Sequence, residues 1–387
     1  ILEEKALNST LGVILFQDQV NKLAMEIGNL SEMEADELRR AFGWKRSNDI
    51  IESYKTLFIK GATSKGLSRD IAIKIFKKFN GQYMFPESHA FAFGVTAYHM
   101  AWLKYYFPLE FFVSIFNQQP MGFYNLETLK EDAKRHNVVV KNPDINISNV
   151  TCSIVGKEML LGLNIIKNLG YKTSEIIINE RYNKGFYKNI NNLISRTGIN
   201  YTQTKNLIYS GALDSLGFSR RDLIWQLGLF ESKPDNQRLM DLDFQDINPV
   251  LSDKNTWKEM LNEYSSLGLY PNGHVMEHVR KQLGDKVIPS NKIERFSAGS
   301  FIFTAGLIIR RQRPLSKAIF LTMEDEFGHI PLMVWPDIYE KNKMVLSQGL
   351  IGVSGIISKR EGTFNVIVQG VWPINNFSHF TQSKDWQ

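Results

Sequence analysis

The chain has 387 residues, 43% of them hydrophobic and 22% charged, so it is long enough for two or three folded domains and too apolar to be a disordered tail. Its 46 lysines and arginines exceed its 40 acidic residues and give a charge of +6, which mildly favours polyanionic partners. No apolar stretch reaches the ~20 residues of a membrane helix, and the charged residues at positions 3–5 argue against a signal peptide. The single cysteine, Cys152, excludes an internal disulfide and a multi-cysteine zinc site. We therefore expect a cytoplasmic protein in a reducing environment, without a membrane partner.

Residues 1–147 have the periodicity of amphipathic helices. Ser31 and Glu34 form the S-x-x-E pattern of a capping box, and Pro108 suits the first turn of a helix. Beyond the capping box, the spacing of apolar residues predicts helices over residues 47–64, 68–79, 89–106, 108–117 and 125–137. We expect an all-α first domain.

Residues 148–230 contain short helices separated by glycine turns. Two segments have a similar helix–turn–helix layout, residues 163–181 around Gly170 and residues 193–213 around Gly198. A polar stretch without periodicity, residues 231–249, is typical of a linker. A helical segment over residues 252–283 follows it, so we treat residues 231–296 as linker and helical segment.

The sequence pattern of the last part of the chain is typical of β-strands. Runs rich in β-branched and aromatic residues span residues 301–311, 318–323, 329–335, 350–358 and 363–371. A short helix is predicted between the third and fourth runs, over residues 336–346. Five strands with this helix placement predict an OB-fold barrel over residues 297–376, followed by a tail over residues 377–387. The fold class is thus multidomain α+β, with all-α domains first and a five-stranded barrel last.

The sequence contains no phosphate-binding Walker loop, no nucleophile elbow and no zinc-protease motif. His274 and His278 have i,i+4 spacing but no third ligand nearby, so we interpret them as a solvated helix start. Residues 324–326 are acidic and are expected to cap a hairpin, and Asp144 is expected to form an Asx turn. We predict no catalytic residue and no metal site in this chain.

Two groups in the first domain have the chemistry to bind an anion. Arg39 and Arg40 project about 100° apart on a helix, so that one can reach a phosphate while the other braces a carboxylate. The alternative is a solvated helix C-terminus whose cations complement the helix dipole. Ser88 is a candidate N-cap with His89 in the first helical turn, and a helix N-terminus with a histidine suits a phosphate. A structural histidine is the alternative there.

The glycine turns and the barrel offer further polyanion contacts. The turn at Gly170 presents backbone N–H groups to phosphates without reading base sequence, although Asn168 stands where such a turn often has its first glycine. The residues that we expect to contact DNA are Lys167, Gly170, Lys172, Gly198, Arg310, Arg311 and Arg313, with Lys317 nearby. Barrels of this kind stack single-stranded bases on aromatic side chains. The aromatic candidates are Phe301, Phe303, Phe320, Trp335 and Phe364, and we expect half of them to fill the barrel core.

One short peptide resembles a docking signal. Gln226, Leu227, Leu229 and Phe230 match the Q-L-x-L-F form with which bacterial proteins bind the sliding clamp, where apolar side chains fill a pocket and the glutamine fixes register. The alternative is the amphipathic end of a helix that begins near Arg220.

Several collinear segments resemble the bacterial C-family DNA polymerases, the polymerase III alpha subunits. These segments are residues 12–19, 34–41, 85–90, 98–104, 143–146, 211–217 with 220–221, 310–314, 321–326 and 334–337. Residues 85–89 and 117–124 resemble the error-prone paralogue in particular. The replicative enzyme commonly has lysine at the position of Glu87. The similarity covers about 370 residues.

The resemblance implies a fingers domain at residues 1–147, tandem helix-hairpin-helix motifs at 148–230 and the barrel beyond. It implies template-directed nucleotidyl transfer in damage-induced translesion synthesis, with primer–template DNA, dNTP, the sliding clamp and mutasome proteins as partners. Arg39, Arg40, Ser88 and His89 would then line the incoming nucleotide. The family's catalytic aspartates and their Mg²⁺ belong to a palm domain that would precede Ile1, so we expect this chain alone to be inactive. A replicative alpha subunit and a non-catalytic DNA-binding scaffold remain the alternatives.

Overall fold

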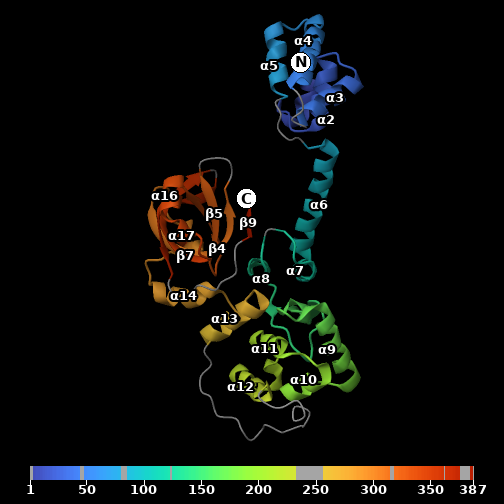
Figure 1. Cartoon of the computed structure of the whole chain (residues 1–387). Coiled ribbons are helices and arrows are strands. Elements are labelled where there is room, and N and C mark those ends of the chain that lie inside the picture. Colours follow the sequence, from blue (N-terminus) through green and yellow to red (C-terminus); the bar gives the residue numbers. More distant parts are fainter. Residues whose placement is uncertain are drawn as a thin grey trace. The chain divides into compact units, whose positions relative to one another are not determined.

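The computed structural model describes residues 3–43, 48–79, 85–122, 124–231, 256–313, 318–360, 362–374 and 384–386 (Figure 1). The chain forms two compact units, residues 1–105 and 106–387, and each is described by itself. No helix in the described part of the chain is long and apolar enough to cross a membrane.

The first unit is helical. Its elements are α1 (Glu4–Leu7), η1 (Asn8–Thr10), α2 (Gln17–Glu26), α3 (Glu32–Gly43), α4 (Asn48–Ser64), α5 (Arg69–Lys77) and most of α6 (Glu87–Tyr106). Phe58, Phe76 and Phe79 pack ring against ring in its core. The capping box is confirmed, because the Ser31 N–H donates to Glu34 at 2.8 Å and the Glu34 N–H donates to the Ser31 hydroxyl at 3.3 Å.

The helical part of the second unit begins with α7 (Pro108–Asn117) and α8 (Leu126–Arg135). A small sheet of β1 (Val140–Lys141), β2 (Ser153–Val155) and β3 (Glu158–Leu160) follows, with β3 in the centre. The remaining helices are η2 (Leu163–Ile165), α9 (Gly170–Lys184), α10 (Ile190–Thr197), α11 (Tyr201–Tyr209), η3 (Asp214–Leu216), α12 (Arg220–Glu231), α13 (Thr256–Leu267), α14 (Val275–Leu283) and α15 (Ser290–Ile293). One continuous apolar core joins α7 and α8 to the helices up to α12.

A buried ionic cluster ties α8 to the α13–α14 segment. Lys130 contacts Glu127 at 3.0 Å, Glu131, and the carbonyl of Gly273 at 2.6 Å. Glu127 also accepts from the Tyr264 hydroxyl at 2.7 Å. Burial raises the pKa of Glu127, whereas for Lys130 burial would lower the pKa but is outweighed by the two carboxylates, which raise it. Each charge in this cluster therefore depends on its partners.

The five-stranded barrel is confirmed. It consists of β4 (Phe301–Gln312), β5 (Ile319–Glu324), β6 (His329–Val334), β7 (Leu350–Arg360) and β8 (Thr363–Pro373). The sheet runs β5-β6-β8-β7-β4, and an additional β4–β5 pairing closes it. The single short helix that was predicted between the third and fourth strands is divided into two helices, α16 (Pro336–Lys341) and α17 (Lys343–Leu346). A further strand, β9 (Lys384–Trp386), pairs in parallel with β4. This is the OB-fold strand order.

Candidate nucleic-acid interface

The two arginines at the end of α3 share one carboxylate. Arg39 donates from Nε and Nη2 to Oδ1 of Asp36, at 2.9 and 2.6 Å, and from Nη1 to the side chain of Gln17 at 3.0 Å. Arg40 contacts Oδ2 of Asp36 at 2.8 Å, and its side chain is 69% exposed against 25% for Arg39. These hydrogen bonds, that of Arg39 above all, lower the pKa of Asp36. Arg39 is thus the bracing residue and Arg40 is the one that faces solvent.

The carboxylate of Asp18 lies at the start of α6, a contact that the sequence did not reveal. Because α6 begins at Glu87, Ser88 lies inside the helix and the expectation that it is the N-cap is wrong. The backbone N–H of Glu87 donates to Oδ2 of Asp18 at 2.8 Å. The exposed His89 ring stacks on Phe85, with centroids 5.4 Å apart, and meets the edge of Phe93 at 4.5 Å. An anion at this helix end would meet the charge of Asp18.

Gln17 connects the two anion-binding candidates of the first unit. Its side-chain oxygen accepts from Arg39 at 3.0 Å, and its backbone N–H donates to the carbonyl of Phe85 at 2.9 Å. The sequence singled out Arg39 and His89 separately, and the structure brings their neighbourhoods together through the first turn of α2. Gln17 and Asp18 were missed as site residues, although they lie in a segment that supported the family resemblance.

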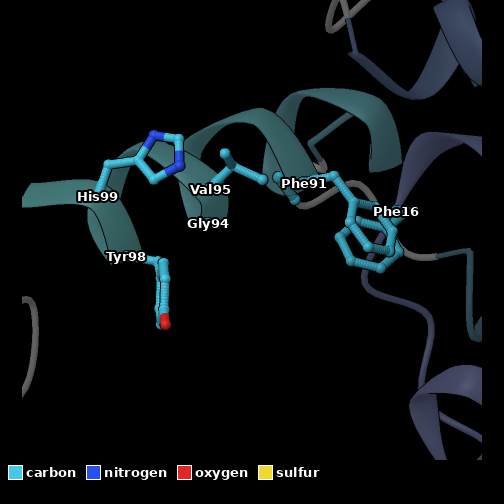
Figure 2. A pocket seen from close by; sticks show the side chains of 7 residues that line it. Phe16, Phe91, Gly94, Val95, Tyr98 and His99 are labelled. Atoms are coloured by element: carbon cyan, nitrogen blue, oxygen red, sulfur yellow. The ribbon is translucent and has the colours of Figure 1, made fainter. Parts of the chain in front are cut away.

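An open apolar cavity of about 570 Å³ extends along α6. Phe16, Phe91 and Tyr98 form its walls, and Gly94 leaves its floor without a side chain (Figure 2). Val95, next to Gly94, and His99, more than one helical turn further along α6, also line the cavity (Figure 2). Phe91 is 70% exposed and Tyr98 is 68% exposed, so flat aromatic surfaces are available there.

The two helix–turn–helix segments lie side by side. Asn206 of α11 donates to the carbonyl of Lys167 at 2.6 Å, and Gln203 donates to the carbonyl of Asn168 at 3.3 Å. Asn168 adopts φ 65°, so it occupies the left-handed region that glycine would otherwise serve, and Gly198 adopts the same φ in the second turn. The asparagine therefore preserves the turn.

The turn of the first helix–turn–helix segment, at Asn168 to Gly170, exposes the N-terminus of α9. Among the described residues no side chain caps α9, so its first backbone N–H groups lack an intrahelical partner. A Cβ on Gly170 would meet nothing within 4 Å, so a ligand can approach the backbone closely. Lys167 and Lys172 are exposed on either side. By contrast, α11 is capped by Asn200. This arrangement has the chemistry of a phosphate contact.

The three barrel arginines differ in their availability. Arg311 donates to the carbonyls of Leu346 and Gln348, both at 3.0 Å, and so braces the end of α17. Arg313 is 63% exposed and lies 3.7 Å from Glu340, which partly offsets its charge. Arg310 is exposed and lies opposite Thr322 of β5. Lys317 falls outside the described residues.

The barrel aromatics do not divide as expected. Phe301, Phe303, Phe320 and Trp335 are all exposed, by 39 to 51%. Only Phe364 of the five candidates packs against the core, and the fully buried core consists of Ile, Leu, Val and Met side chains. The expectation that half of these aromatics fill the core is therefore wrong.

The clamp-like peptide lies in α12. Gln226 and Leu227 are 6% and 1% exposed, and Leu227 belongs to the core of the second unit. Leu229 is half-buried, and the side chain of Phe230 falls outside the described residues. In this conformation, the peptide can enter a partner's pocket only if the last turns of α12 unwind.

His274, Asp325 and Asp144, which the sequence analysis assigned to no functional site, have structural roles. His274 is buried, not solvated as predicted: its Nδ1 caps α14 by accepting from the Met276 N–H at 3.1 Å, and burial lowers its pKa well below the usual value. Asp325 accepts from Phe327 and Gly328 within the β5–β6 hairpin and also pairs with Arg280 at 3.0 Å. Asp144 forms its predicted Asx turn with Asn146. Across the described ranges, no group of three or more His, Cys, Asp or Glu residues is placed to hold a metal ion.

Family models match three stretches of the chain in order. Residues 2–66 match the bacterial DNA polymerase III alpha subunit finger domain, residues 137–223 a helix-hairpin-helix motif, and residues 302–374 an OB-fold nucleic acid binding domain. The resemblance to the bacterial DNA polymerase III alpha subunits is confirmed.

Curated relatives match along nearly the whole chain. The error-prone DNA polymerase of Corynebacterium glutamicum is 31% identical over 380 residues, covering 96% of this chain and 35% of the relative. Those of Mycobacterium tuberculosis (30% identity, 94% and 34% coverage) and Anaeromyxobacter sp. (32%, 96% and 34%) are similar. This chain thus spans about a third of the length of these relatives. One solved structure, that of asparaginyl-tRNA synthetase from Pyrococcus horikoshii, is 21% identical to this chain, with a TM-score of 0.22. The match covers 25% of this chain and 24% of the synthetase chain.

Proposed function

We propose that this chain is the nucleotide-binding and DNA-holding part of an error-prone DNA polymerase that acts in damage-induced translesion synthesis. The observation that carries the proposal is the match over 96% of the chain to a protein named error-prone DNA polymerase. The relatives' names favour this reading over a replicative alpha subunit.

In this proposal the hairpin pair grips the primer–template duplex. The uncapped start of α9, open space over Gly170, and exposed Lys167 and Lys172 support phosphate contacts. Such contacts fix the position of the protein on the duplex without reading its sequence. A polymerase requires that property, because its template sequence is arbitrary.

The incoming dNTP is assigned to the first unit. Arg40 offers an exposed cation for its phosphates, with Arg39 held in place by Asp36 and Gln17. The aromatic cavity beside Gly94 is of a shape and polarity that suit a nucleobase. Ser88 and His89 directly precede Ala90, the first residue of α6 that lines this cavity.

Phosphoryl transfer in polymerases uses a pair of divalent metal ions. As the family resemblance implies, we assign Mg²⁺ and the catalytic carboxylates to a palm domain outside this chain and derive no chemical step here. The sliding clamp and mutasome proteins are proposed as further partners. Clamp docking through Gln226 to Phe230 requires α12 to unwind at its end.

The test is binding of the 387-residue chain to fluorescein-labelled primer–template duplex, followed by anisotropy over a salt series. We expect a log–log slope of about −0.9 per phosphate contact, and a slope shallower by about one for each of Lys167→Ala and Lys172→Ala. Lys157→Ala, an exposed lysine in the turn between β2 and β3, is the matched control. Absence of duplex binding at low salt, or equal losses in all three variants, would contradict the assignment of DNA binding to the hairpins.

A further inference from the structure

One side chain of α2 connects the arginine pair of the first unit to the start of α6. Gln17 is half-buried and is the first residue of α2. Its side-chain oxygen accepts a hydrogen bond from Nη1 of Arg39 at 3.0 Å, and its backbone N–H donates to the carbonyl of Phe85 at 2.9 Å. Gln17 is thus held by backbone on one side and holds a guanidinium on the other.

The contacts continue from Arg39 to Arg40 through a single carboxylate. Nε and Nη2 of Arg39 both donate to Oδ1 of Asp36, at 2.9 and 2.6 Å. Oδ2 of Asp36 lies 2.8 Å from Nη2 of Arg40. Each carboxylate oxygen therefore pairs with a different arginine. We call the four residues Gln17, Arg39, Asp36 and Arg40 the Gln17 network.

Arg39 uses only one oxygen of Asp36, although an arginine often binds a carboxylate through both oxygens. The bond from Nη1 to Gln17 accounts for this geometry, because the guanidinium is planar and a contact at Nη1 fixes the orientation of the whole group. Oδ2 is thereby left to Arg40. Without the acceptor of Gln17, Arg39 would be free to turn, bind both oxygens and compete with Arg40 for Asp36.

Arg40 is the member of the Gln17 network that meets solvent. Its side chain is 69% exposed, whereas that of Arg39 is 25% exposed. Two arginines share one carboxylate, so the network keeps a net positive charge that can attract an anion. An arginine that is already held in place loses less conformational freedom on binding than one that moves freely. Asp36 thus orients Arg40 without neutralising the network.

The other end of Gln17 lies at the aromatic cavity. Phe16, its neighbour in the chain, lines that cavity with Phe91 (Figure 2). Phe16 also forms a parallel β-bridge with Phe85, directly before α6. A nucleotide has its phosphates and its base at a separation set by the sugar, so a site that binds both ends must keep its two parts in register. Gln17 is placed to do so, because its backbone belongs to one part and its side chain reaches the other.

We propose that Gln17 is a positioning residue of the nucleotide site, which holds Arg40 through Arg39 and Asp36 at a fixed place relative to the aromatic cavity. This inference rests on the proposed function, in which Arg40 binds the phosphates of the dNTP and the cavity receives its base. Gln17 contributes through Arg40 and makes no phosphate contact of its own.

The experiment measures primer extension by the full-length error-prone polymerase that we propose. Gln17→Met keeps the length of the side chain and removes the acceptor, whereas Gln17→Glu keeps an acceptor at the same length. We expect Gln17→Met to raise the KM for dNTP about threefold to tenfold with kcat within about twofold of the parent, and Gln17→Glu to restore the KM. Glu26→Met, at the exposed last position of α2, is the matched control and should leave KM unchanged.

Two further measurements locate the effect at the phosphates. In the Arg40→Ala background, Gln17→Met should cause no further rise in KM, because residues that act through one another are not additive. Inorganic tripolyphosphate, a competitor that has no base, should inhibit Gln17→Met more weakly than the parent, by the same factor as the rise in KM. An unchanged inhibition constant would place the effect of Gln17 at the base and overturn the proposal.

The remaining outcomes separate this proposal from the proposed function. An unchanged KM in Gln17→Met, an equal rise in Gln17→Glu, or a rise that persists in the Arg40→Ala background would overturn the positioning role alone. An unchanged KM in Arg40→Ala would instead remove Arg40 from the nucleotide site and with it the nucleotide assignment on which this inference rests. Thermal unfolding of the 387-residue chain by circular dichroism verifies that each variant is folded.

Discussion

The carboxylate of Asp18 lies 2.8 Å from the backbone N–H of Glu87 and so accepts the first hydrogen bond at the start of α6. The contact joins residues 69 positions apart in the chain. Together Asp18 and Glu87 place two acidic residues at a helix end whose dipole would otherwise attract a phosphate. Lys22, 4.0 Å from Glu87, offsets part of this charge.

Removing this negative charge should strengthen nucleotide binding. Asp18→Asn keeps a hydrogen-bond acceptor for the Glu87 N–H, and Glu87→Lys reverses a charge one residue from Ser88. In the full-length error-prone polymerase that we propose, we expect each variant to lower the KM for dNTP several-fold, by roughly the strength of a helix-terminus charge interaction. Asp70→Asn, in the first turn of α5, is the control. A KM that rises in both variants would mean that the carboxylates position the nucleotide.

Arg39 and Arg40 should respond differently to truncation. Arg39→Ala removes the hydrogen bonds of Arg39 to Asp36 and Gln17 and should lower the free energy of unfolding by about 1.5–3 kcal/mol, the range for hydrogen bonds to a charged group. Arg40→Ala should leave stability nearly unchanged and raise the KM for dNTP. Urea unfolding and steady-state kinetics separate the two effects. An unchanged KM in Arg40→Ala removes that residue from the nucleotide site.

The buried cluster around Lys130 should be sensitive to loss of its cation. Lys130→Met leaves Glu127 and Glu131 buried without a counter-charge, so we expect a loss of about 3–5 kcal/mol in the free energy of unfolding. Adding Glu131→Gln should recover part of that loss, because one of the two buried charges is then removed. Chemical denaturation followed by circular dichroism measures both. A single variant as stable as the parent would show that the carboxylates take up protons at little cost.

His274 predicts a specific loss of stability in acid. Burial and the neighbouring cations Lys130, Lys134, Arg135 and Arg280 lower its pKa in the folded state. The unfolded chain therefore binds an extra proton below the usual histidine pKa of about 6.5, and stability falls as pH drops through that value. His274→Asn keeps a helix cap without the titration, so its denaturation midpoint should fall less between neutral and mildly acidic pH. Parallel pH profiles for the two proteins would exclude His274 as the cause.

Phe230→Ala tests the clamp hypothesis. If the end of α12 unwinds onto a sliding clamp, the variant should bind the clamp at least about tenfold more weakly in a pull-down titration or by surface plasmon resonance, as expected for an aromatic anchor. Trp225→Ala, an exposed residue of α12 outside the motif, serves as control. Retained affinity in Phe230→Ala would leave the peptide as a helix end.

Regular elements were predictable where the sequence carries a strong local signal. Helix α7 was predicted over its observed residues, because Pro108 opens it and an apolar run fills it. The barrel strands were predicted within about two residues, because β-branched and aromatic runs are separated by turn residues. The strands β1 to β3 were missed, since segments of two or three residues are too short to show a period.

Features that depend on distant partners were not predictable. His274 is buried beside the helix α8 cluster, which lies more than a hundred residues earlier and contacts the adjacent Gly273 through Lys130. The local sequence mixes polar residues with Val275 and Met276 and does not reveal that contact. The core of the barrel was misjudged for the same reason. Alternation assigned each aromatic residue to one of two faces, but only the closed sheet shows which face is inside.

Because the barrel interior is aliphatic, the tryptophan fluorescence of this domain comes from side chains outside its buried core. Trp335 and Trp372 lie outside the fully buried core, and that core contains no tryptophan. Their emission should therefore respond to what covers the barrel surface while the strands remain paired. The chain has seven tryptophans, so a fluorescence change reports on this surface when it is lost in Trp335→Phe and Trp372→Phe variants. Such a change without a change in far-ultraviolet ellipticity would be a signature of occupancy, with no dye attached to either partner.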